Sequence, residues 1–169
     1  MANQPGKLSD EWFTPLWILE WLPRIALDPF WSEDSHVGVS VPVGRTFDIR
    51  RGQDAGTLSW NHGLRGIVFM NPPYNNCSVW IARAAEQLAQ HPDLTIVMLI
   101  PAIPGERYWH KYIWRHSIVL FLNGRVKFDT VNGTAKTGGN NGSALVVMGK
   151  NAEETANFIR SKAALQIYG

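Results

Sequence analysis

The chain has 169 residues and a formal net charge of +2, and 45% of its residues are hydrophobic while 18% are charged. This length predicts a single domain over residues 1–169, and the composition excludes a chain that is disordered throughout. The small positive charge permits a nucleic-acid partner but does not require one. The single cysteine, Cys77, excludes an internal disulfide framework and a cysteine-based zinc site, and the five histidines show no metal-ligand spacing.

The N-terminal residues lack the apolar core of a signal peptide, and no apolar run approaches the length of a membrane span. We therefore expect a soluble, cytoplasmic protein with no membrane partner. Residues 1–9 are polar and include a proline and a glycine, so we expect a loose end there.

The first predicted element is a helix that opens at residues 10–15. Thr14 is a candidate N-cap, and Pro15 suits the first helical position because the amide hydrogen that proline lacks is not needed there. Apolar residues continue on one side as far as Leu22, and Pro23 ends the helix.

Apolar runs predict the strands, the first of which ends in the carboxylate of Asp28; the runs cover residues 25–29, 45–49, 66–70, 94–100, 117–122 and 143–148. Further helices are predicted over residues 79–90, 104–114 and 152–165. A short helix or irregular segment is expected over residues 30–43, a loop over residues 50–56, and a flexible loop over the Gly- and Asn-rich residues 129–142. The alternation predicts a three-layer α/β/α domain with a mostly parallel sheet, and the two late strands predict a C-terminal antiparallel hairpin.

The sequence Asn71-Pro72-Pro73-Tyr74 follows a predicted buried strand directly. Because the two prolines cannot donate to a strand ladder, they make a rigid turn at the carboxyl end of the strand, where open α/β sheets bind ligands. The Asn71 side-chain oxygen and the Pro72 carbonyl can both accept hydrogen bonds from one exocyclic amino group, and the Tyr74 ring can stack on the attached planar system. Two such acceptors favour the pyramidal form of an adenine amino group, which can attack a methyl group.

This turn resembles motif IV of the S-adenosylmethionine-dependent amino-methyltransferases. Other stretches are similar to the small phage-type DNA N6-adenine methyltransferase (Dam) family, in the same order and over nearly the whole chain. These stretches are Trp12-Phe13-Thr14-Pro15, Leu27-Asp28-Pro29 with Ser32, Asp54 with Leu58 and Trp60, Leu99-Ile100-Pro101-Ala102, residues 124–128 and residues 143–147.

The resemblance implies a Rossmann-like class I methyltransferase fold that uses S-adenosylmethionine to methylate the N6 amino group of adenine in double-stranded DNA. It implies that catalysis rests on Asn71, Pro72, Pro73 and Tyr74. It implies cofactor contacts from Trp12, Thr14, Pro15, Asp28, Pro29, Ser32 and Asp54. Because Ala55-Gly56 interrupts the family's Asp-Gly-Leu spacing, Asp48 is a candidate to share or replace the role of Asp54.

Four cationic residues are candidates for phosphate contacts: Arg107, Arg125, Lys127 and Lys136. A phage-encoded enzyme of this kind would act in the host cell cytoplasm, and we expect a monomer or a weak homodimer. Two alternatives stay open. The same fold and turn also serve enzymes that methylate RNA adenine or a protein glutamine amide. Phe30 and Trp31, which are bulky where the family usually has small residues, also suit a non-catalytic DNA-binding or decoy protein with a filled cofactor pocket.

Overall fold

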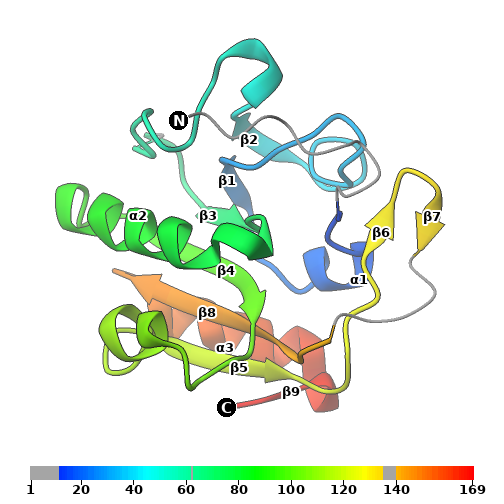
Figure 1. Ribbon diagram of the computed structural model, residues 1–169, viewed down its shortest axis with the longest axis vertical. Helices are drawn as coiled ribbons and strands as arrows, with labels where there is room; N and C mark the ends of the chain where they lie inside the picture. Colours follow the sequence, from blue (N-terminus) through cyan, green and yellow to red (C-terminus); the bar gives the residue numbers. More distant parts are fainter. Residues whose placement is uncertain (1–11, 62, 135–139) are drawn as a thin grey trace.

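The computed structural model describes residues 12–61, 63–134 and 140–169. Its centre is a seven-stranded sheet with the strand order β2-β1-β3-β4-β8-β5-β9 (Figure 1). The strands of this sheet are β1 (Ile25–Asp28), β2 (Val43–Thr46), β3 (Ile67–Met70), β4 (Thr95–Pro101), β5 (Ile118–Leu122), β8 (Ser143–Gly149) and β9 (Ile167–Tyr168).

The sheet is mostly parallel, as predicted. β1 pairs in parallel with β2 and with β3, and β3 pairs in parallel with β4. β8 is antiparallel to both of its neighbours, β4 and β5, so β5 runs in the same direction as β4. β9 is antiparallel to β5 at the edge of the sheet. The predicted antiparallel pairing of the two late strands is therefore present, with β8 inserted between β4 and β5.

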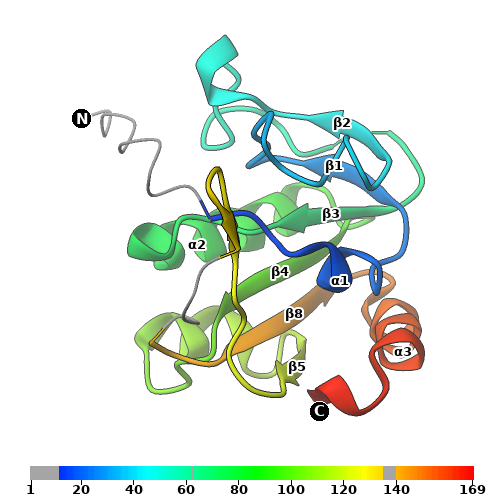
Figure 2. The ribbon, with the colours of Figure 1, turned by 90° about the vertical axis from the view of Figure 1, so that its right-hand side faces the viewer.

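Helices cover both faces of the sheet, so the chain forms three layers (Figure 2). One face carries α2 (Cys77–Gln90) and the π-helix η4 (Trp109–Ile113), and the other carries α1 (Leu16–Leu19) and α3 (Ala152–Ala163), which leads into the 3-10 helix η5 (Ala164–Gln166). Successive residues of β4 point to opposite faces: Met98 packs on the α2 side, and Leu99 packs on the α3 side. All seven residues of β4 are buried, which explains its unbroken apolar sequence.

The start of the chain departs from the sequence prediction. Thr14 does not cap α1: Pro15 occupies the N-cap position with an extended ψ of 145°, and no side chain caps the helix. Thr14 is buried instead. The helix is a single turn ending at Leu19, because the next two backbone hydrogen bonds, from Trp21 to Ile18 and from Leu22 to Leu19, are already of the tighter three-residue type ahead of Pro23.

Three further segments also differ in their bounds. The strand predicted over residues 45–49 lies earlier, at β2, because the Asp48 side chain caps the 3-10 helix η2 (Ile49–Arg51). The helix predicted over residues 104–114 is regular over the shorter η4. Part of the predicted flexible loop forms a small hairpin of β6 (Asp129–Thr130) and β7 (Gly133–Thr134), while residues 135–139 lie outside the described residues.

Within residues 12–61, 63–134 and 140–169, no helix is long and apolar enough to cross a membrane.

Candidate active site

The candidate site lies along the carboxyl edge of the parallel strands. β1 ends at Asp28, and the adjacent β3 ends at Met70, directly before the Asn71 turn. β2, on the other side of β1, ends at Thr46, two residues before Asp48. Because these three strands pair in parallel, the residues that follow them lie at one edge of the sheet, where open α/β sheets bind ligands.

The turn at residues 71–74 is held between β3 and α2, as predicted. Pro73 precedes the single 3-10 turn η3 (Tyr74–Asn76), and α2 starts at the next residue. Pro72 is buried, Asn71 is half-buried, and the Tyr74 side chain is 37% exposed. The Asn71 amide and the Tyr74 ring therefore project from a turn whose backbone is stiffened by two prolines.

The orientation of the Asn71 amide is set by a distant part of the chain. Its Nδ2 donates a hydrogen bond to the backbone carbonyl of Trp12 over 3.2 Å. A carbonyl can only accept, so the nitrogen of the amide must face Trp12 and the Oδ1 must face away. The Asn71 oxygen is therefore left as an acceptor on the other side of the side chain.

Three aromatic rings pack beside this amide. The Tyr74 and Phe128 rings meet edge to face, with centroids 5.7 Å apart and planes at 86°. Trp12 meets the same Phe128 ring at 5.8 Å and 80°. Phe128 is only 2% exposed, whereas Trp12 is 48% exposed. The sequence reasoning did not assign Phe128 to the site, although polar and apolar residues alternate along 125–128, which is a signal that Phe128 faces inward.

A pair of backbone hydrogen bonds between Phe13 and Asp129 holds the Trp12 segment beside Phe128. The Phe13 N–H donates to the Asp129 carbonyl over 2.8 Å, and the Asp129 N–H donates to the Phe13 carbonyl over 3.0 Å. In Figure 2 the dark-blue segment before α1 accordingly passes beside β6. Phe13 itself is buried, so the segment that carries Trp12 is anchored on both its backbone and its side chain.

The Tyr74 side chain is suited to contributing its ring and not to transferring a proton. Burial raises its pKa above the ordinary value, and a polar interaction with the Ser143 side chain offsets part of the rise. The phenol therefore stays neutral over the physiological range, which leaves the ring face as its useful feature.

Asp28 is a buried carboxyl group at the end of β1. It is 5% exposed, and its Oδ1 accepts a hydrogen bond from the Phe30 N–H over 2.9 Å. Burial raises the pKa of Asp28 to about 7, and the Phe30 hydrogen bond offsets only part of this effect. A carboxylate in such surroundings favours either a proton or a cationic partner, and perturbed groups of this kind are common at functional sites.

The two bulky residues after Asp28 pack on opposite faces of the sheet. The Phe30 ring meets Trp80 of α2 edge to face at 4.7 Å. Trp31 packs against the cluster on the α3 face, and its Nε1 donates to the Val37 carbonyl over 2.8 Å. Each ring therefore has a structural role in a different layer.

The two candidate acids of the cofactor site differ in their surroundings. The Asp48 carboxylate is buried and accepts hydrogen bonds from the backbone N–H and the Nε of Arg50 over 3.0 and 3.2 Å. It also forms an ion pair with Arg51 at 3.5 Å. The carboxylate of the half-buried Asp54 accepts one N–H, from Gly56, over 2.8 Å. The Asp48 carboxylate is therefore held by residues of its own 3-10 helix. Within the described part of the chain, the Asp54 carboxylate forms no ion pair.

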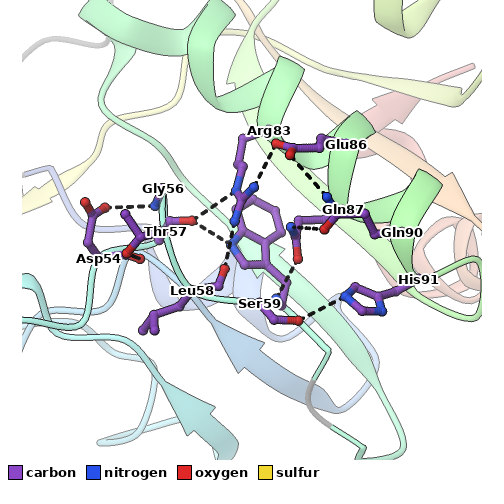
Figure 3. Close-up of polar contacts among 12 residues, drawn as sticks. Asp54, Gly56, Thr57, Leu58, Ser59, Arg83, Glu86, Gln87, Gln90 and His91 are labelled. Atoms are coloured by element: carbon purple, nitrogen blue, oxygen red, sulfur yellow. Dashed lines mark hydrogen bonds and ion pairs between the residues drawn. The ribbon is translucent and has the colours of Figure 1, made fainter.

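A polar network fastens the loop after Asp54 to α2 (Figure 3). Arg83 Nη2 donates to the Leu58 carbonyl over 2.9 Å, and the fully buried Gln87 accepts from the Trp60 N–H over 2.6 Å. In Figure 3 the Asp54 carboxylate lies on the side of the loop away from Arg83. Sequence reasoning missed Arg83 and Gln87, because their partners are mostly backbone groups 25 and 27 residues away.

The remaining sequence candidates are spread around this edge. Pro29 is buried, and Ser32 Oγ accepts from the Asp34 N–H over 3.4 Å. Pro15 and Lys127 line a groove on the α1 side.

Three of the four candidate phosphate contacts are exposed. Arg107 follows β4, and Arg125 and Lys127 follow β5, so all three come after strands whose carboxyl ends lie at the edge that bears the site. Lys136 lies outside the described residues. In the described part of the chain, no three His, Cys, Asp or Glu side chains are grouped to hold a metal ion.

One of three comparisons with known proteins gives a match. A family model described as DNA N-6-adenine-methyltransferase (Dam) matches residues 1–167. No curated protein and no solved structure matches the chain. Because the family model covers essentially the whole sequence, the chain belongs to the DNA N-6-adenine-methyltransferase (Dam) family.

Proposed function

We propose that this protein methylates the N6 amino group of adenine in DNA, using S-adenosylmethionine on a Rossmann-like class I methyltransferase fold. One observation carries the proposal. The Asn71 turn follows β3, its amide is oriented by the Trp12 carbonyl, and it lies next to the strand that ends in the buried Asp28. Membership of the Dam family supports adenine in DNA as the substrate.

In this mechanism the turn holds and orients the target amine. The Asn71 Oδ1 and the Pro72 carbonyl accept the two amino hydrogens, which favours a pyramidal nitrogen with its lone pair available for attack. Tyr74 stacks on the adenine ring. The nitrogen would form its new bond to the methyl carbon as the bond from that carbon to the sulfonium sulfur breaks, which leaves a neutral thioether, and it would lose a proton to solvent afterwards, so the site needs no strong base.

The residues at the edge of the sheet fit a cationic cofactor. S-adenosylmethionine supplies an electrophilic methyl group on a positively charged sulfonium. The buried Asp28, whose pKa is raised by burial, gains most from a nearby positive charge. We assign Asp54 to the polar groups of the cofactor, and Asp48 to holding its own turn through Arg50 and Arg51. Pro29 and Ser32 would shape the turn after Asp28.

The DNA would be held by cationic residues around the same edge. Arg107, Arg125 and Lys127 are exposed and suit contacts with phosphates, which position the duplex without reading its sequence. An adenine in a duplex must leave the base stack to reach Asn71, at a cost of a few kcal/mol.

The test is an assay of the purified protein with methyl-labelled S-adenosylmethionine and unmethylated DNA, followed by nucleoside analysis. We expect the label in N6-methyl-deoxyadenosine. Cofactor binding with label only on RNA or on a protein amide would replace the DNA substrate in the proposal. Neither label nor heat of cofactor binding in calorimetry would contradict the enzyme assignment and support a non-catalytic protein.

A further inference from the structure

We propose that the Trp12 ring is a second stacking surface for the target adenine, in addition to Tyr74. The proposal rests on the function proposed above and deepens it, because it moves Trp12 from the cofactor pocket to the base site. Three observations carry it: the position of the Trp12 backbone, the exposure of its ring, and the buried ring that it shares with Tyr74.

The backbone of Trp12 is part of the Asn71 site. Its carbonyl accepts the Asn71 Nδ2 hydrogen bond over 3.2 Å, so the Trp12 Cα lies close to the amide that would hold the target amine. The neighbouring Phe13 is bridged to Asp129 by two backbone hydrogen bonds. The Trp12 side chain therefore starts from an anchored backbone beside the reacting group.

Trp12 leaves apolar ring surface exposed to solvent beside the Asn71 turn. As whole residues, Trp12 is 48% exposed and Tyr74 is 37% exposed, whereas Phe128, which both rings contact, is 2% exposed. Phe128 alone cannot stack on a base while the other two rings cover it. Exposed aromatic faces on an anchored backbone are the surfaces on which nucleic-acid bases stack.

The Trp12 and Tyr74 rings are both held against one buried ring. Trp12 and Tyr74 stand at 80° and 86° to the plane of the same Phe128 ring, with centroids 5.8 and 5.7 Å from it. Asn71 and Pro72 supply acceptors in the plane of the base, and the two exposed rings supply contact with its faces. Hydrogen bonds along one direction and stacking along another would together fix the plane of the adenine.

The test compares Trp12→Leu, Trp12→Phe and the matched control Trp17→Ala. Trp17 is 41% exposed in the same N-terminal segment, but its ring packs on Trp21. Leucine keeps an apolar cover over Phe128 and removes the aromatic face. For each variant we would measure kcat and KM for DNA, the cofactor Kd by calorimetry, and the circular dichroism spectrum.

We expect Trp12→Leu to lower kcat/KM for DNA by about 10- to 100-fold, because stacking on one aromatic side chain is worth about that much. Trp12→Phe should recover most of the loss, the cofactor Kd should stay within about twofold for every variant, and Trp17→Ala should behave as the wild type. A raised cofactor Kd with unchanged KM for DNA would overturn the proposal in favour of a cofactor contact, and wild-type kinetics in Trp12→Leu would overturn it outright. Wild-type protein that methylates no DNA would instead contradict the proposed function itself, before any variant is compared.

Discussion

The side-chain amide of Asn71 is hydrogen-bonded to the backbone carbonyl of Trp12, 59 residues earlier in the chain, over 3.2 Å. The bond orients the amide so that its oxygen is presented away from Trp12. A backbone carbonyl neither rotates away nor changes charge, so it is a more fixed acceptor than a side-chain group. The N-terminal segment thus belongs to the same site as the turn after β3.

Asp28 should make the free energy of unfolding depend on pH in an unusual direction. Burial raises its pKa to about 7, whereas an unfolded carboxyl group ionises near pH 4. Between these values the folded protein binds more protons than the unfolded one, so stability falls as pH rises from about 4 to about 7, by up to about 4 kcal/mol. The measurement is urea unfolding of the cofactor-free protein across this range, with Asp28→Asn as the variant that should lack this fall.

Asp28 should also couple cofactor binding to pH. A positive charge beside the carboxylate stabilises its ionised form, so binding should release a proton below about pH 7. We expect the affinity for S-adenosylmethionine to rise about tenfold from pH 6 to pH 8, and Asp28→Asn to bind weakly at both values. Calorimetry in two buffers with different ionisation enthalpies measures the proton directly. A wild-type affinity that is flat with pH would argue against Asp28 as the cation's partner.

Asp48 and Asp54 should give opposite results when each is replaced. Asp48→Ala removes the cap of η2 and the ion pairs with Arg50 and Arg51, so it should lower the free energy of unfolding by about 0.5–2 kcal/mol. Asp54→Asn keeps an acceptor for the Gly56 N–H, so its stability should change little while its cofactor Kd rises about tenfold. Thermal unfolding and calorimetry on both variants decide the matter, and the reverse pattern would exchange the two roles.

Gln87 should be needed for stability although it lies outside every recognised motif. Its Oε1 accepts from the Trp60 N–H in a site where both residues are fully buried. Gln87→Leu leaves that N–H without its partner, which should cost about 1–3 kcal/mol of unfolding free energy. The exposed neighbour Gln90 provides the control: Gln90→Glu keeps an acceptor for the Gln87 Nε2 and should stay within about 0.5 kcal/mol of the wild type in urea unfolding. Equal losses in the two variants would contradict the role given to the buried bond.

The central part of the fold could be predicted from local sequence because its signals are local. β3, β4 and β8 are unbroken apolar runs, and α2 has a regular amphipathic pattern. The turn after β3 could also be predicted, since two prolines cannot extend a ladder. By contrast, the insertion of β8 between β4 and β5 depends on pairings between distant strands, which no local pattern encodes.

Only some of the residues of the candidate site could be predicted from local sequence patterns. Asn71 and Asp28 were found because each follows an apolar run at a strand end. The Trp12 hydrogen bond and the Phe128 ring contacts were not, because they join segments that meet only in the folded chain. The Thr14 cap was wrong for a related reason, since burial of Thr14 in the tertiary structure outweighed its local preference for a cap.

The most direct test of the central claim is Asn71→Ala, compared with Asn75→Ala, which changes an exposed amide in the next turn. For both variants we would measure labelled methyl transfer to adenine in DNA and the Kd for S-adenosylmethionine. We expect Asn71→Ala to lose about 100-fold or more in kcat, because it removes an acceptor aimed at the reacting amine, with a nearly normal cofactor Kd. Asn75→Ala should turn over like the wild type. Retained turnover in Asn71→Ala would contradict the claim that the turn after β3 carries the chemistry.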